Sequence, residues 1–250
     1  MAIYLDVQQI LIGIFNISFI IISLVISILF LRKYIKQKEN DFLMIGIVWF
    51  LISTPWLHGA LTFILMLFDV LLMKAIRMII FYMFIPIAIT IWMNTFTNFL
   101  YWDKKKLLVA VYCLISVICE VLFFIFLFID IKGLVGDFDY ANGIYFIATY
   151  KPFIRFSMLF FLASGFITFM LFAKESLEST NPEVKWKGIF LVIAFSSYTV
   201  CAILDSFAFF SQYIALIVLI RLLLILSSIE FYLGWFLPDF VVKLLRISSG

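Results

Sequence analysis

Seven stretches of the chain are almost continuously apolar, and each runs for more than 20 residues. A helix needs about 20 residues to cross the hydrocarbon core of a bilayer. The stretches are too long for barrel strands and lack a period-two alternation. The pattern therefore predicts an all-α, polytopic bundle of seven transmembrane helices. The predicted spans are Val7–Leu31, Phe42–Phe68, Ala75–Trp102, Leu107–Ile129, Phe153–Ala173, Gly188–Phe210 and Tyr213–Phe236.

Composition supports a membrane protein. The chain has 250 residues, of which 66% are hydrophobic and 13% charged, and its mean hydropathy is +1.21. Soluble domains are roughly half apolar and a quarter charged, so the lipid bilayer is the expected partner of this surface. Residues 1–250 form one transmembrane domain without an evident repeat. The net charge of +3 lies in short clusters between spans, which argues against nucleic-acid binding.

The basic residues predict the orientation. Twelve lie in loops on one side of the predicted bundle and five on the other or just inside span ends. The twelve are Arg32, Lys33, Lys36, Lys38, Lys104, Lys105, Lys106, Lys174, Lys185, Lys187, Lys243 and Arg246, and the five are Lys74, Arg77, Lys132, Lys151 and Arg155. Cytoplasmic loops carry the excess of Lys and Arg. We expect a multi-pass protein of the cell membrane, with the N-terminus outside, the C-terminus cytoplasmic and residues 237–250 forming a cytoplasmic amphipathic tail.

The longest outer loop, 130–151, contains a hairpin signal. Asn142-Gly143 lies between aromatic and apolar residues, in the segment Tyr140–Tyr145. This dipeptide favours a tight turn between two strands, so a short β-hairpin over the outer mouth of the bundle is predicted. Asp137 and Asp139 share a strand face there, and solvated charges are a better interpretation than a cation site.

Two prolines, Pro55 and Pro86, fall inside predicted spans. Each removes a backbone hydrogen bond and should bend its helix, either as a static kink or as a hinge beside a cavity.

Six ionisable residues from six spans fall at similar depth, in the predicted outer half of the bundle. They are His58, Arg77, Glu120, Arg155, Asp205 and Arg221. Charges inside a membrane are costly and usually face the bundle interior, so we expect them to converge. One interpretation is a polar pocket open to the outside that holds a small polar or anionic ligand, since arginines suit carboxylates and phosphates. The other is a set of structural ion pairs, with arginines reaching toward the headgroups.

A second polar group lies nearer the cytoplasmic side. Asn94 and Asn98 form a stripe on span 3, and Glu230 lies at similar depth on span 7. A hydrogen-bonded contact between these spans is predicted, either structural or acting as a latch that changes on activation.

Catalytic and cofactor motifs are not found in the sequence. One histidine cannot form an H-E-x-x-H zinc site, and no P-loop, G-x-S-x-G or G-x-G-x-x-G occurs. Span 7 has no lysine for a retinal Schiff base. The three cysteines lie inside apolar runs, where they resemble small core residues. We therefore expect no enzyme activity, no cofactor and no metal.

The exit from span 7, Tyr232–Arg246, resembles that of the seven-span N-terminal sensor modules of prokaryotic histidine kinases and related signalling membrane proteins. An aromatic–Leu–Gly stretch ending at Gly234 is followed by Trp235, Pro238 and a short basic amphipathic segment. Asp239 departs from that pattern, in which a basic or aromatic residue is expected.

The resemblance implies a receptor-like or sensory module that signals through span 7 to a cytoplasmic partner. Two alternatives remain open from the sequence. The chain could be a small transporter or channel, or a non-catalytic subunit of a membrane complex.

Overall fold

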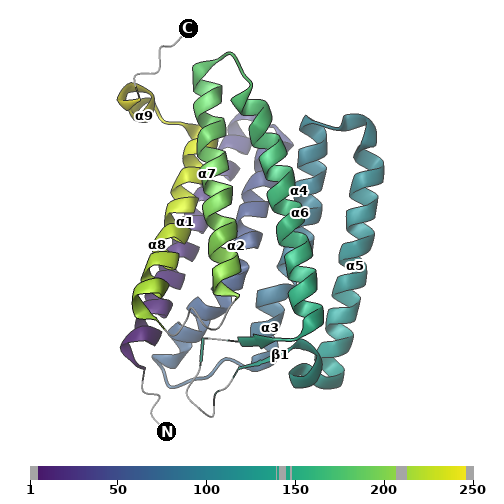
Figure 1. The fold of residues 1–250 in the computed structure, drawn as a ribbon, viewed down its shortest axis with the longest axis vertical. Helices are drawn as coiled ribbons and strands as arrows, with labels where there is room; N and C mark the ends of the chain where they lie inside the picture. Colours follow the sequence, from purple (N-terminus) through teal and green to yellow (C-terminus); the bar gives the residue numbers. More distant parts are fainter. Residues whose placement is uncertain (1–4, 139, 141–144, 147, 207–212, 246–250) are drawn as a thin grey trace.

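The computed structural model describes residues 5–138, 140, 145–146, 148–206 and 213–245, which form long helices and one small pair of strands (Figure 1). The elements are α1 (Val7–Gln37), α2 (Asn40–Met66), α3 (Lys74–Tyr82), α4 (Phe84–Phe99), η1 (Trp102–Lys104), α5 (Lys105–Asp130), η2 (Ile131–Val135), β1 (Gly136–Phe138), β2 (Ala148–Tyr150), α6 (Pro152–Leu177), α7 (Pro182–Asp205), α8 (Ile214–Phe236) and α9 (Asp239–Leu244).

Seven helical segments of the described chain are long and apolar enough to cross a membrane. They coincide with the seven predicted spans, which confirms the helical bundle. The third is α3 followed by α4, and the fourth includes η1 and η2 around α5. The predicted end of the sixth span, 207–210, lies outside the described residues.

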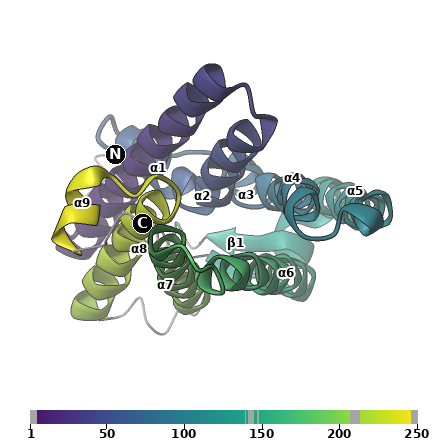
Figure 2. The same ribbon diagram turned by 90° about the horizontal axis from the view of Figure 1, so that it is seen from above.

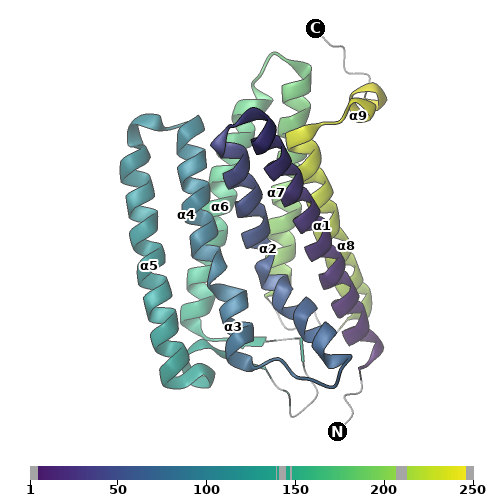
Figure 3. The ribbon, with the colours of Figure 1, turned by 180° about the vertical axis from the view of Figure 1, so that it is seen from behind.

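Six of the long segments close into a ring, and α5 lies outside it. Viewed from above, α1, α2 and α4 form one side and α8, α7 and α6 form the other (Figure 2). Contacts between α1 and α8 and between α4 and α6 join the two sides. α5 packs chiefly against α4, and Figure 3 shows these two helices standing beside the rest of the bundle.

The two termini lie at opposite ends of the bundle (Figure 1). We call the end that carries β1, β2 and α3 the strand end and the opposite end the α9 end. Near the α9 end the interior is filled by stacked aromatic rings. Ring centroids lie 3.7 Å apart in Trp92–Phe169, 3.6 Å in Phe169–Phe195 and 3.9 Å in Trp49–Phe231. All five side chains are buried.

Pro86 accounts for the break in the third span. α3 ends at Tyr82 and α4 begins at Phe84, one turn before the proline that cannot donate a backbone hydrogen bond. The carbonyl oxygen of Pro86 accepts hydrogen bonds from the hydroxyls of Thr90 and Ser116, at 3.0 Å each. The regular helix is interrupted just before Pro86, whereas α2 continues as one helix through Pro55; a bend at either proline stays a prediction.

The loop between α5 and α6 contains a strand pair. β1 and β2 run antiparallel, with Gly136 opposite Tyr150 and Phe138 opposite Ala148. The predicted Asn142-Gly143 turn lies outside the described residues, as do Asp139 and most of the segment between the strands. In the tail, the described part is the short helix α9, which follows Leu237 and Pro238; Arg246 and residues 247–250 lie beyond it.

Candidate functional site

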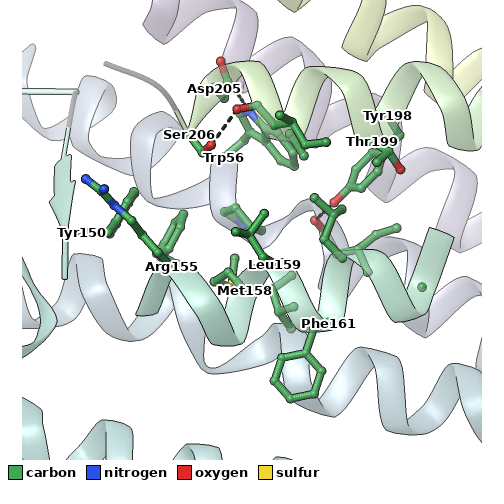
Figure 4. Close-up of a pocket in the computed structure, with 18 of the residues that line it drawn as sticks. Trp56, Tyr150, Arg155, Met158, Leu159, Phe161, Tyr198, Thr199, Asp205 and Ser206 are labelled. Atoms are coloured by element: carbon green, nitrogen blue, oxygen red, sulfur yellow. Dashed lines mark hydrogen bonds between the residues drawn. The ribbon is translucent and has the colours of Figure 1, made fainter. Parts of the chain in front are cut away.

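A cavity of about 570 Å³ lies in the strand-end half of the bundle, mainly between α2, α4, α6 and α7 (Figure 4). Its walls are largely apolar and aromatic, including Ile52, Ile85, Leu159 and Phe161. Polar side chains also line it: Asn16, His58, Tyr150, Arg155, Thr199, Asp205, Ser206 and Arg221. The volume falls in the range of pockets that hold small molecules, roughly 300–1,000 Å³.

The cavity is elongated along α6 and ends at the aromatic stack. Its lining on α6 runs from Ile154 to Phe169, which corresponds to about 22 Å of helix. Phe169 and Phe195, which stack on each other, also line it and form its floor. Because the rings below them fill the interior, the cavity is a blind slot and not a continuous passage.

The wall between α6 and α7 faces outward. Leu159 on α6 and Ile203 on α7 line the cavity, yet 48% and 37% of their surfaces are exposed. Phe156, one turn nearer the strand end, is 72% exposed. α6 and α7 are joined at the α9 end and separate toward the strand end (Figure 1). For a chain in a bilayer, these side chains place the mouth of the cavity beside the lipid.

A hydrogen-bonded ion pair joins three helices at the cavity wall. Arg221 of α8 donates from Nη1 to Oδ2 of Asp205 on α7. Trp56 of α2 donates its indole N–H to the same oxygen, at 2.7 Å. Figure 4 shows Asp205 above Trp56 at one side of the cavity. The predicted convergence is therefore found for Asp205 and Arg221, whose charges balance.

Arg77 and His58 form a second group beside the cavity. Arg77 is fully buried and donates from Nη1 to the Tyr140 hydroxyl at 2.9 Å. Its guanidinium carbon lies 3.6 Å from the centre of the Phe138 ring, a cation–π contact. Nη2 lies 3.4 Å from Nδ1 of His58. A guanidinium can only donate, so Nδ1 accepts, which assigns the proton of a neutral His58 ring to Nε2.

The interpretation of Arg77 as a side chain reaching for the headgroups is wrong. Aromatic rings of the loop between α5 and α6 cover it, and among the described residues no carboxylate contacts it. The loop could not be placed over Arg77 from the sequence, because that contact joins residues about 60 positions apart.

Two polar groups of the cavity lining lack partners within the described chain. Arg155 on α6 is exposed, and its side chain makes no hydrogen bond or ion pair there. It lies near Tyr150 (Figure 4). Asn16 on α1 is 4% exposed, and its Oδ1 has no donor. Its Nδ2 would lie 2.3 Å from a Cβ at Gly59, so a glycine is what allows it to pack against α2.

Glu120 does not join the cluster. It lies on α5, outside the ring of helices, and does not line the cavity. Its neighbours include Cys119 and Tyr82, and its two carboxylate oxygens are buried without a hydrogen-bond partner in the described structure. The sequence indicated the depth of Glu120 along its helix, which matches that of the arginines. It did not show that α5 lies outside the ring, away from them.

The predicted contact between spans 3 and 7 is also wrong. Asn98 donates to Oδ1 of Asp41 on α2 at 2.8 Å and accepts from Lys105 at 2.6 Å. Asn94 donates to the sulfur of Met44 at 3.1 Å. Glu230 instead lies beside Ser197 on α7.

At the strand end, Asp137 pairs with two lysine side chains. Its carboxylate lies 2.5 Å from Nζ of Lys74 and 3.5 Å from Nζ of Lys132. The hydrogen bond from Lys74 is the main cause that lowers the pKa of Asp137 below its ordinary value. Burial raises the pKa of the Tyr150 phenol, so its hydroxyl stays protonated. No group of three potential metal ligands occurs in the described part of the chain.

The sequence did not single out most of the residues that line the cavity, among them Asn16, Trp56 and Tyr150. Trp56 and Asn16 lie inside apolar runs, where single polar groups give little signal, although Trp56 lies two residues before the singled-out His58. No known protein family, curated protein or solved structure matches the chain, so its site is interpreted from geometry alone.

Proposed function

We propose that the chain is a receptor-like membrane module that binds a ligand in the strand-end cavity and signals through α8. The observation that carries this proposal is the cavity itself, with the Asp205–Arg221 pair in its wall. The pair joins α7 to α8, and Trp56 adds α2. A ligand that moves any of these side chains acts on α8 directly.

The route from α8 leads out of the bundle. Gly234 packs closely on α7, where a Cβ would lie 2.6 Å from the Leu191 side chain. Leu237 then adopts a left-handed conformation with φ of 35°, and α9 follows with Phe240 and Leu244 exposed. A left-handed non-glycine residue costs about 1 kcal/mol or more, so this exit is poised to change shape. By the excess of basic residues, the α9 end is cytoplasmic and the strand end is outside, in the cell membrane.

The blind floor favours a receptor over a channel. A pore needs a continuous polar path, whereas Trp92, Phe169 and Phe195 fill the interior below the cavity. Flux of solutes through proteoliposomes, if observed, would favour the transporter instead.

The test is a distance measurement between spin labels at Lys36 and Lys243, both exposed at the α9 end. The labels are attached to introduced cysteines after Cys113, Cys119 and Cys201 have been replaced. Palmitate, hexadecanol, succinate and phosphate serve as probes in phosphatidylcholine nanodiscs. At least one probe should shift the distance, and Ala202→Phe, which fills the cavity, should abolish that shift. A label pair at Lys36 and Lys104 is the control and should not respond. A distance unchanged by every probe contradicts the proposal.

A further inference from the structure

We infer that the cavity binds a single-chain anionic amphiphile, such as a long-chain fatty acid, that enters from the bilayer between α6 and α7. This inference rests on the proposed ligand-binding role and names the class of ligand. Three features carry it: the shape of the slot, its opening toward lipid and the one cation in its lining that lacks a partner in the described structure.

The shape suits one hydrocarbon chain. A volume of about 570 Å³ spread over roughly 22 Å of helix gives a mean cross-section on the order of 25 Å². That is enough room for one extended hydrocarbon chain lying along α6. The walls along this length are largely apolar, so they can replace the lipid contacts that an acyl chain gives up when it leaves the bilayer.

The opening suits a ligand from the membrane. Its edges are the exposed apolar side chains Leu159 and Ile203, on facing helices. A small polar solute would have to pass such a rim, whereas an acyl chain enters along it without leaving an apolar medium. The apolar rim and walls are why a fatty acid fits better than a small polar ligand.

The charges suit an acidic head at the strand end. Asp205 and Arg221 neutralise each other, and Asp205 is further held by Trp56. Arg155 lies at the same end of the slot and has no anion beside it in the described residues. A guanidinium binds a carboxylate through two parallel hydrogen bonds.

The experiment measures quenching of Trp56 by bromine-labelled palmitate in phosphatidylcholine nanodiscs. Trp56 lines the cavity, so the signal is the quenching that Trp56→Phe removes. Unlabelled palmitate and hexadecanol then compete for the site. Quenching should saturate, and Ala202→Phe should abolish it.

Arg155→Gln decides the role of the head group. It should weaken competition by palmitate about 10-fold and leave hexadecanol within about 2-fold, because the alcohol carries no charge. Arg155→Lys should retain most of the palmitate affinity. Since Arg155 is exposed and partnerless in the described structure, neither change should unfold the protein.

Two results overturn the inference. Quenching that does not saturate and persists in Ala202→Phe shows only partitioning into the bilayer. An equal loss for palmitate and hexadecanol in Arg155→Gln shows that Arg155 does not recognise the head. If palmitate binds as expected but no probe changes the Lys36–Lys243 distance, the ligand class stands and the receptor proposal fails. If another probe changes that distance and palmitate does not bind, the receptor proposal stands and the fatty-acid inference fails.

Discussion

The ion pair between Asp205 and Arg221 should be a main source of stability in the strand-end half of the bundle, which contains the cavity. The two side chains are 24% and 12% exposed, so both are partly shielded from water, although Asp205 as a whole residue is exposed at the end of α7. Breaking a buried ion pair on one side typically costs about 3–5 kcal/mol, because the remaining charge is left uncompensated. Partial exposure lowers this figure, and we expect Asp205→Asn to lower the free energy of unfolding by about 2–3 kcal/mol.

The Asp205→Asn variant removes the negative charge but can keep the hydrogen bond from Trp56, so it measures the effect of the charge alone. The asparagine side-chain oxygen can still accept from the Trp56 indole, whose bond to Asp205 is 2.7 Å long. Trp56→Phe is the matched variant, because it removes that bond and keeps both charges. We expect it to cost about 1–2 kcal/mol.

The assay is unfolding of the purified protein in mixed micelles by titration with a denaturing detergent, for the single variants and for the double variant Asp205→Asn with Arg221→Gln. The double variant should be more stable than the sum of the single effects implies, with a coupling of about 2 kcal/mol. A loss below about 0.5 kcal/mol for Asp205→Asn, or strict additivity, would refute the idea that the pair is desolvated and energetically coupled.

Three further predictions concern the strand end and the α1–α2 contact. Arg77→Lys keeps the charge but loses the planar contact with Phe138 and the fork that reaches Tyr140, so the same titration should show a loss of about 1–2 kcal/mol, more than Tyr140→Phe produces; an equal loss would contradict it. Gly59→Ala brings a Cβ to 2.3 Å from Nδ2 of Asn16 and should cost about 1–3 kcal/mol, and Asn16→Ala should largely suppress that loss; a tolerated Gly59→Ala would show that the helices separate easily. Asp137 has a lowered pKa in the folded protein, so its bond to Lys74 stabilises the strand pair above the ordinary pKa of about 4 and is lost as the pH falls through the lower folded value. Amide exchange of β1 and β2 should therefore accelerate, relative to its ordinary pH dependence, in that acidic range, and Lys74→Met should remove the added acceleration.

The helical bundle could be predicted because its signal is local. Each span is a continuous apolar run, and Pro86 marks its own break without reference to any other helix. The pairing of Asp205 with Arg221 was within reach for a related reason. The two residues lie on consecutive helices at matching depth, so the α7–α8 hairpin brings them together.

Depth alone could not place the other residues. Glu120 lies at the level of the arginines, but α5 stands outside the ring, and nothing in its own sequence reveals this. The predicted contact between Glu230 and Asn94 was wrong for the same reason. Two residues at the same depth in the bundle need not belong to neighbouring helices. The cover over Arg77 comes from Phe138 and Tyr140, which belong to a distant loop. These placements depend on packing between helices, which no single run of residues encodes.

The α9-end half of the bundle is filled by aromatic rings, and the strand-end half contains the cavity. Amino-acid substitutions in the two halves should therefore have different effects. Substitutions among the stacked rings that do not line the cavity, such as at Trp49 or Phe231, affect whether the bundle assembles. Substitutions of the apolar side chains that line the slot, away from the Asp205–Arg221 pair, alter what it can accommodate and leave the rings below in place. A protein divided in this way can shift its chemical preference over generations while its architecture stays fixed.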